Sequence, residues 1–593
     1  ALIFGEKDFT DPRHIDNSAL ARKKETVQQI YNADYRFARP PNKALLTAFP
    51  GDEQVTLIWD DLAEKSFDPF LREFDFEGYL IFRSTEPNFE ENLIITDAFG
   101  NTVFQKPIAQ FDLKNGLRGL HPVAVNGIQF NLGTDSGLRH TLIDRDVING
   151  ETYYYAVVAY DRGLIARSAD GTVATSPDGS VRGLSPSLTT AVIKNDVAGN
   201  IVTDINTAAI TPRAPTAGYV PPELGNLAMT TVGTGTVSIE VVAPELIEQE
   251  STYELTFTNS SIWQNDSEVG YTLVNQTTGA VLDEGVVTGG SLEIPPVEGF
   301  VVNIQTATTV AVIDTTVQFV GDQGTFTPVV RPASVSAAVS SRFTPLPADF
   351  EIRFTESIAD TSLRLAFGML EIPTPFYVQN LTTGKRQDFI LLETIEALRN
   401  GAFDHGELIV LVSGETPDQK PVLEGGRWRS NWAIRLVAPD PQLEPGIPVI
   451  PPPPGSALRF RTSKPFQTGD RVTFQTKPPS FDQQQAVRGL DDIFVVPNPY
   501  VATSTFEPPN TFRAGRGERR LYFMHLPPQC TIRIYTITGQ LVQTLHHQST
   551  IDDGQLAWDL VSKDGMNIAY GVYIYHVDAP EIGEHIGRFA VIK

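Results

Sequence analysis

The chain has 593 residues, of which 41% are hydrophobic, a net charge of −25 and an isoelectric point near 4.8. This length fits about four domains of ordinary size, each able to bury a core. The acidic surface argues against nucleic acid and anionic membranes as partners, and the single cysteine, Cys530, excludes an intrachain disulfide.

Helical patterns are confined to two stretches. In residues 16–32 apolar side chains recur near helical spacing after a capping Asp16 or Asn17, and 391–401 is a shorter helix that stops at Gly401. Residues 1–38 lack the basic leader of a signal peptide, so we interpret them as a segment at the end of an upstream domain. No stretch approaches the ~18 uninterrupted apolar residues of a transmembrane helix.

Almost everything else consists of short alternating strands between Gly, Pro, Asn and Asp, which predicts an all-β chain of tandem β-sandwiches with one short N-terminal helix. VTLIWDD at 55–61 and YLIFRST at 79–85 are the first two clear strands. In 146–161 an Asn-Gly turn precedes a third, along which alternate residues share one face.

Residues 39–204 place Trp59 in the second strand, Tyr79 in the third and Tyr153 after a tight turn. With these three positions the segment resembles a fibronectin type III domain. The resemblance implies that Tyr153 is a corner tyrosine whose hydroxyl bonds to nearby backbone. Residues 86–140 exceed what the family needs, and we expect them to be an insertion.

Four prolines predict a stiff, extended linker over 205–225. An internal repeat follows, because YELTFT at 253–258 matches FEIRFT at 350–355, and YTLVNQTTG at 271–279 matches FYVQNLTTG at 376–384. We therefore expect two β-sandwiches of similar build, over 226–335 and 336–490.

The proline-rich stretch 439–456 is interpreted as an excursion within the second repeat. We assign both strands that follow it, ALRFRTS and DRVTFQT, to the second repeat as well.

Residues 491–593 contain five short motifs followed by a final short strand. The motif residues are Pro497, Asn498, Pro499, Tyr535, Gly539, Trp558, Asp559, Gly565, Gly571 and Tyr573. With these motifs in this order, the segment resembles the C-terminal, Ig-like sorting domain of cargo proteins of the type IX secretion system of Bacteroidota, which also ends on a short strand. The architecture also resembles the small β-sandwich of flagellar hook-cap proteins.

This resemblance implies transport. The domain would be read by the secretion machinery at the outer membrane, and the passenger would reach the cell surface or the medium.

Three groups of residues are candidates for binding. The first could hold calcium on a loop, with a solvated acidic loop as the alternative; it comprises Asp60, Asp61, Glu64, Asp68 and Asp75. The second could contact an anion or pair internally, and comprises Arg513, Arg516, Arg519 and Arg520. The third could stack on a glycan or pack in cores, and comprises Trp263, Trp428 and Trp432.

The sequence carries no Gly-x-Ser-x-Gly elbow, His-Glu-x-x-His or phosphate-binding loop, and we expect neither catalytic residues nor a cofactor other than calcium. The leading hypothesis is a non-enzymatic structural or adhesive surface protein, a rod of four β-domains that self-assembles or contacts other surface proteins. One alternative is the spacer or carbohydrate-binding part of a larger secreted enzyme. Another is a carbohydrate-binding module acting alone.

Overall fold

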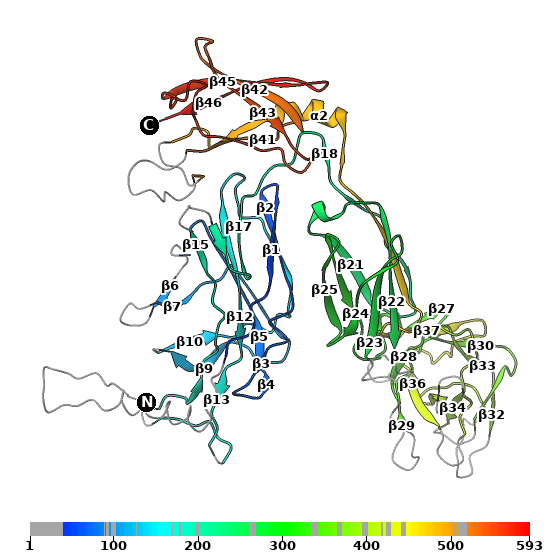
Figure 1. The fold of residues 1–593 in the computed structure, drawn as a ribbon. Coiled ribbons are helices and arrows are strands. Elements are labelled where there is room, and N and C mark those ends of the chain that lie inside the picture. Colours follow the sequence, from blue (N-terminus) through cyan, green and yellow to red (C-terminus); the bar gives the residue numbers. More distant parts are fainter. Residues whose placement is uncertain are drawn as a thin grey trace, which may run out of the picture.

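The computed structural model describes residues 39–592, except 88, 90–93, 97–101, 126, 169, 177–178, 196–200, 260–267, 334–341, 364–370, 394–400, 415, 417–418, 423–427, 440–445, 502–505 and 508–518. This part of the chain is built almost entirely of antiparallel strands, as predicted (Figure 1). Its single α-helix is α2, Gln483–Gly489. The predicted N-terminal helix at 16–32 lies outside the described residues. No helix among the described residues is long and apolar enough to cross a membrane.

The first domain is a sandwich of a three-stranded and a four-stranded sheet. The smaller sheet has the order β1-β2-β11, from Leu46–Gly51, Gln54–Trp59 and Thr141–Asp144. The larger has the order β17-β12-β5-β8, from Thr207–Ile210, Tyr153–Asp161, Phe76–Ser84 and Ala109–Asp112. Alternate residues of these strands meet in one core around Trp59, Tyr79 and Tyr155.

Two predicted boundaries of this domain change. Residues 86–140 are not simply an insertion, because β8 within them pairs with β5 from Gly78↔Asp112 to Ile81↔Ala109. Residues 207–210 are not linker, because β17 pairs with β12. Strand β12 is buried along its whole length, since a second apolar cluster that includes Phe130 and Leu132 covers its other face.

The first repeat packs a sheet with the path β19-β38-β22-β23-β24 against β21-β26-β25. Strand β22, Ser251–Asn259, pairs on one side with β23, Val269–Asn275, and on the other with β38, Arg471–Lys477. DRVTFQT therefore belongs to the first repeat and not to the second, where we had placed it. The remaining strands are β19 Glu223–Leu224, β20 Ala228–Thr230, β21 Thr236–Val241, β24 Ala280–Val287, β25 Ser291–Val297 and β26 Phe300–Gln305.

The second repeat is nested within the first. Its sheet β27-β37-β30-β33 packs on β28-β36-β35-β34 around Phe350, Phe376 and Trp432. The proline-rich stretch connects two of its strands, β36 and β37, so it is an excursion within this repeat. The strands are β27 Gln318–Val320, β28 Thr327–Pro332, β30 Phe350–Phe354, β33 Phe376–Asn380, β34 Phe389–Leu392, β35 Leu408–Ser413, β36 Arg429–Val437 and β37 Ala457–Phe460.

The two repeats share their turn chemistry, as the internal match predicted. The Asn275 side chain accepts from the backbone N–H groups of Thr277 and Thr278, and Asn380 accepts from those of Thr382 and Thr383. The second predicted helix, 391–401, is only partly described. Its first residues, Leu391 and Leu392, lie in strand β34, and 394–400 lie outside the described residues.

The C-terminal domain (residues 490–592) packs the sheet β40-β41-β44 on β43-β42-β45-β46. The first sheet comprises Phe494–Val496, Leu521–Met524 and Leu556–Trp558. The second comprises β42 Gln529–Thr536, β43 Leu541–Gln548, β45 Gly571–Ala579 and β46 Gly583–Val591.

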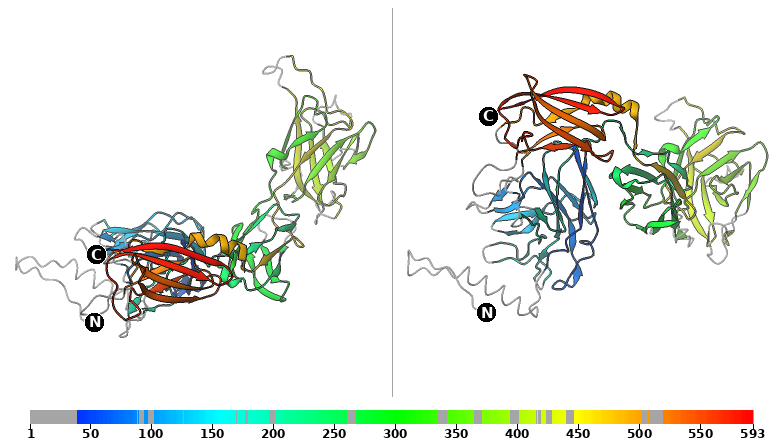
Figure 2. Two further views of the ribbon diagram at one scale, coloured as in Figure 1. Left: turned by 90° about the horizontal axis from the view of Figure 1, so that it is seen from above. Right: turned by 45° about the horizontal axis from the view of Figure 1, so that its top comes forward.

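The four domains do not form a rod. In Figures 1 and 2 the C-terminal domain lies across one end of the first domain, and the two repeats form a second arm beside it. Residues 213–219, within the predicted linker 205–225, run beside the C-terminal domain. Farther along, β18, Tyr219–Val220, pairs with β39, Ser480–Phe481.

Candidate functional site

The motif residues of the C-terminal domain all lie in one sandwich and have structural positions. Asn498 anchors the start of the domain to the last strand: its Oδ1 accepts from the N–H of Ala590 at 3.1 Å, and its Nδ2 donates to the carbonyl of Arg588 at 3.4 Å. The next residue but one, Tyr500, exchanges backbone hydrogen bonds with Ala590 and Ile592, each 2.8 Å long. The first motif therefore fixes the chain beside β46.

The glycines of the motifs occupy turns. Gly539 has φ +85° in the turn between β42 and β43, where its N–H donates to the carbonyl of Thr536, and Gly565 has φ +76° in the loop after β44. A side chain would strain both positions. Tyr535, Asp559 and Gly571 lie at strand ends beside these turns, and the Asp559 Oδ1 accepts from the N–H of Val561 at 3.1 Å.

The aromatic motif residues build the core of the same domain. Trp558 is 2% exposed, and its Nε1 donates to the carbonyl of Val561 at 3.0 Å. Tyr573 stacks on Phe589 with ring centroids 5.5 Å apart, and Trp558 meets the same ring edge-on at 6.1 Å. These aromatic residues therefore help to determine the shape of the domain.

The three aromatic residues of the first-domain resemblance meet in one core. Trp59 and Tyr79 pack edge to face at 5.8 Å. The Tyr153 hydroxyl accepts from the N–H of Ile148 at 3.0 Å and donates to Glu151 at 2.7 Å. The predicted bond from Tyr153 to nearby backbone is thus present.

Four of the five candidate calcium ligands have separate partners. Asp60 accepts from the N–H of Leu45, and Asp61 pairs with Lys65. Glu64 contacts the Tyr79 hydroxyl at 3.1 Å and His140 Nε2 at 2.6 Å, while Asp68 accepts from three backbone N–H groups. Among the described residues, no three acidic, histidine or cysteine side chains are grouped to hold a metal ion.

Asp75 differs from the other four. It is 2% exposed, and its Oδ2 has no hydrogen-bond partner. Burial, followed by the charges of Asp161 and Asp68, raises the pKa of this carboxyl from 3.8 to about 6. Burial likewise raises the pKa of nearby Glu77 to about 7. The first domain thus holds buried titratable carboxyl groups around the start of strand β5.

The candidate tryptophans and arginines lie partly within the described residues and partly outside them. Trp432 is fully buried and donates through Nε1 to the carbonyl of Leu346, and Trp428 is 4% exposed, so both pack in cores and neither offers a face to a glycan. Trp263 lies outside the described residues. Of the four arginines, Arg519 and Arg520 are half-buried just before β41, whereas Arg513 and Arg516 lie outside the described part.

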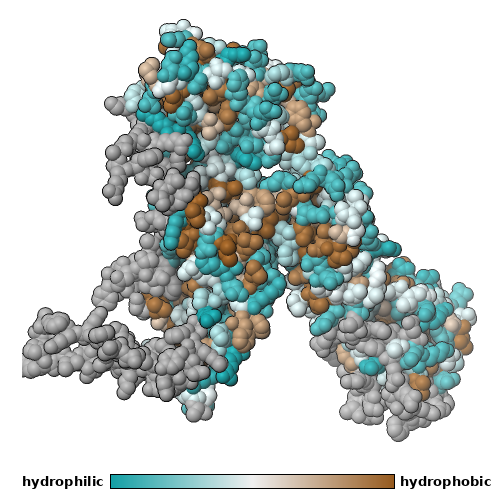
Figure 3. Space-filling model, viewed as in Figure 1, coloured by the Kyte–Doolittle hydropathy of each residue, from teal (hydrophilic) through white to brown (hydrophobic). Residues whose placement is uncertain are grey.

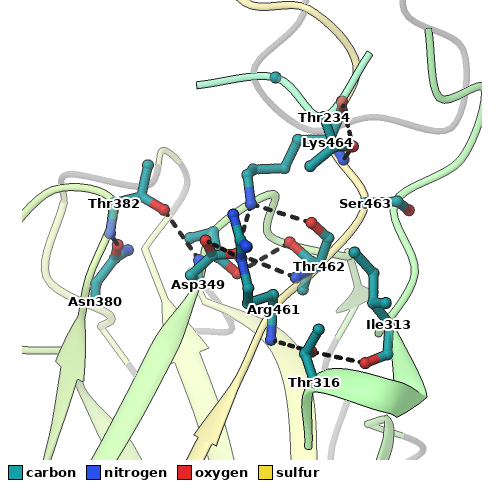
Figure 4. A network of polar contacts seen from close by, with 12 residues as sticks. Thr234, Ile313, Thr316, Asp349, Asn380, Thr382, Arg461, Thr462, Ser463 and Lys464 are labelled. Atoms are coloured by element: carbon teal, nitrogen blue, oxygen red, sulfur yellow. Dashed lines mark hydrogen bonds and ion pairs between the residues drawn. The ribbon is translucent and has the colours of Figure 1, made fainter. Parts of the chain in front are cut away.

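A buried ion pair lies where the chain crosses from the second repeat back to the first (Figure 4). The Lys464 ammonium donates to Asp349 at 2.5 Å and to the carbonyl of Thr462 at 3.0 Å. Burial lowers the pKa of Lys464, against the raising effect of Asp349. On the first-repeat side, the Lys464 N–H donates to the Thr234 hydroxyl at 2.9 Å. The network therefore couples the two repeats.

A cavity of about 500 Å³ opens where the first domain, the first repeat and the C-terminal domain meet. Apolar residues gather on the face of Figure 3 where the first domain lies beside the first repeat. The cavity is lined by Phe49, Tyr219, Ile551 and six prolines: Pro50, Pro215, Pro221, Pro244, Pro478 and Pro479. Sequence reasoning missed this junction, because its lining comes from segments hundreds of residues apart.

Neither a protein-family model nor a curated protein sequence matches the chain. Among solved structures it is similar to PorZ, a surface component of the type IX secretion system of Porphyromonas gingivalis, with 12% identity, 75% of this chain and 50% of that chain covered, and a TM-score of 0.15. It is also similar to latent PorU from the same organism, with 11% identity, 78% and 40% covered, and a TM-score of 0.12.

A third similar structure is a tetra-tandem repeat from the extending region of a large adhesion protein, with 10% identity, 93% and 99% covered, and a TM-score of 0.10. The chain's matches span half the length of PorZ and two fifths of PorU. Similarities at these TM-scores assign no function to this chain.

Proposed function

We propose that the protein is a non-enzymatic extracellular or cell-surface β-protein, exported by the type IX secretion machinery and acting through its surfaces. The observation that supports this most is the C-terminal domain. Ten residues that resemble the sorting-domain motifs come together in a single two-sheet sandwich as turns, core aromatics and strand anchors. In this proposal residues 491–593 are the folded export signal.

The outer face of the sheet β43-β42-β45-β46 is the surface available for recognition. Strand pairing of Thr536 with Tyr573 brings Ile537 opposite Val572, and Val572 in turn pairs with Ala590. Ile537 is 71% exposed, Val572 47% and Ile586, farther along β46, 68%. Exposed apolar residues that adjoin on one sheet face are typical of a contact surface.

Export of the full chain in a bacterium that has a type IX system tests the proposal. With a leader for the first membrane added, the chain should reach the medium or cell surface, and a strain without the translocon should retain it in the periplasm. Ile537→Lys with Val572→Lys should reduce export at least tenfold. Gln529→Lys, at an exposed position at the other end of the same sheet, is the matched control.

Periplasmic retention of the unmodified chain in the competent strain would contradict the export proposal. The non-enzymatic part is tested separately. Purified chain should show no turnover of peptide, ester or glycoside substrates, and a turnover that co-purifies with it would contradict that part.

A further inference from the structure

A short strap (residues 213–219) crosses the C-terminal domain and contacts it. The Thr216 N–H and hydroxyl both donate to the carbonyl of Ile551, at 3.0 and 2.7 Å. The Ala217 N–H donates to the carbonyl of Leu526 at 3.2 Å, and the Gly554 N–H donates to that of Ala214 at 2.9 Å. The strap is therefore bonded through its backbone to two loops of the domain.

Charge fixes one end of the strap. The two terminal nitrogens of Arg213 contact different carboxylates, Nη2 that of Asp552 at 3.0 Å and Nη1 that of Asp553 at 3.1 Å. All three side chains are about two-thirds buried. An arginine shared between two carboxylates in such a partly buried position holds its partners more firmly than an exposed pair does.

The C-terminal domain also presents a second apolar surface, outside its own core, to the strap and the first domain. Strand β41 is buried on both sides: Leu521 and Phe523 point into the domain's own core. Tyr522 and Met524 instead pack with Ala214 of the strap in a separate cluster. If the C-terminal domain separated from the rest of the chain, it would expose Tyr522 and Met524, which are 3% and 0% exposed in the structure.

At three glycines the C-terminal domain, the strap and the first domain approach one another too closely for a side chain. A Cβ on Gly554 would come within 2.4 Å of the carbonyl oxygen of Pro215, and one on Gly150, in the turn before β12, within 2.9 Å of Met524. Gly218 lies equally close to helix α2, whose Gln485 side chain donates to the carbonyl of Tyr219. The contact thus includes the strap, the first domain and the helix leading into the C-terminal domain.

From these contacts we infer that the C-terminal domain is a permanent part of the molecule. It stays bound to the strap and the first domain after the chain is cut between the first repeat and the C-terminal domain. This inference goes beyond an export function, since a domain that serves only as an export signal could be released without exposing apolar surface. Its partner is the chain's own segment 213–219 together with the Gly150 turn.

The experiment uses the full chain with a protease recognition sequence inserted between Pro479 and Ser480, where Ser480 is exposed. After complete cutting, the two fragments should co-elute in gel filtration at micromolar concentration and 150 mM salt. Arg213→Glu combined with Gly150→Trp should cause loss of co-elution. Arg331→Glu, which breaks an exposed ion pair with Asp314 in the second repeat, is the matched control and should leave co-elution intact.

Thermal unfolding of the uncut variants checks that each is folded. Separation of the unsubstituted fragments would overturn the inference. Co-elution that survives the combined substitution in a folded protein would also overturn it, because the strap and the Gly150 turn would then not be what retains the domain.

Discussion

Single residues in this protein carry charge in places where a β-sandwich normally holds apolar side chains. Asp75, Glu77 and Glu407 are all nearly or fully buried, and burial raises the pKa of each. Lys464 is the cationic counterpart, with its pKa lowered by burial. The buried carboxyl groups make the free energy of unfolding depend on pH. The stability contributed by Lys464 depends on its ion-pair partner.

Asp75→Asn should remove a pH-dependent destabilisation of the first domain. The folded-state pKa of about 6 lies above the unfolded value of 3.8, so ionisation costs stability as pH rises through this window. The substitution should raise the free energy of unfolding by about 2 kcal/mol at pH 8 and leave it nearly unchanged at pH 3, below both pKa values. Denaturant unfolding at both pH values measures this, with Asp61→Asn, a partly exposed carboxyl of the same domain, as the control. An equal effect at both pH values would contradict it.

Lys464→Met should destabilise the chain by about 2 kcal/mol, because it removes the ammonium partner of the half-buried Asp349 and leaves that carboxylate with the more exposed Arg461. The double variant with Asp349→Leu should recover most of that loss, since neither charge then remains. A double-mutant cycle in urea separates the pair from each residue's own packing. Lys477→Met, which removes an exposed pair with Glu223, should change stability by less than about 0.5 kcal/mol.

At the scale of strands, the sequence predicted where strands occur better than which strands pair with one another. The strands around Trp59, Tyr79 and Tyr153 and the Asn-x-Thr-Thr-Gly turns were found, because alternation and turn residues are local signals. The partner of DRVTFQT was not, because an alternating pattern does not say which sheet a strand joins. In the structure each repeat uses the same three-strand order, β38-β22-β23 and β37-β30-β33. The two strands after the proline stretch therefore belong to one repeat each.

This nesting predicts that the second repeat can be removed. Residues 311 and 463 lie side by side, since the Ser463 N–H donates to the carbonyl of Ala311 at 2.8 Å. Replacing 312–462 with an Asn-Gly turn should leave a soluble protein that unfolds cooperatively, with the first repeat intact. Deleting 464–477 should instead abolish the fold of the first repeat, because β38 lies inside its sheet. Circular dichroism and thermal unfolding compare the two; aggregation of the first variant would argue against nesting.

At the scale of the whole molecule, the sequence predicted the number of β-domains but arranged them in a rod. Motif positions such as Trp558 and Gly539 follow from local chemistry and could be placed in advance. The strap could not, because RAPTAGY at 213–219 has the composition of an ordinary linker and its binding surface is formed more than 300 residues later by Leu526, Ile551 and Gly554. The two-arm shape in Figures 1 and 2 follows from such non-local contacts.

Glu293 holds the two arms together away from the C-terminal domain. Its Oε1 accepts from the His140 N–H at 3.1 Å and from the Thr141 hydroxyl at 3.2 Å, which joins β25 of the first repeat to the first domain. A cavity of about 440 Å³, lined by both arms, borders this contact. Glu293→Ala should therefore let the arms separate, with a larger radius of gyration in small-angle X-ray scattering.

Each arm keeps its own core, so the melting temperature of Glu293→Ala should change little. Glu284→Ala, on the exposed strand β24 of the same repeat, is the matched control and should leave the scattering curve unchanged. An unchanged curve for Glu293→Ala would mean that the strap and the C-terminal domain alone set the angle between the arms. In that case Arg213→Glu, which loosens the strap, should be the variant that widens the distance distribution.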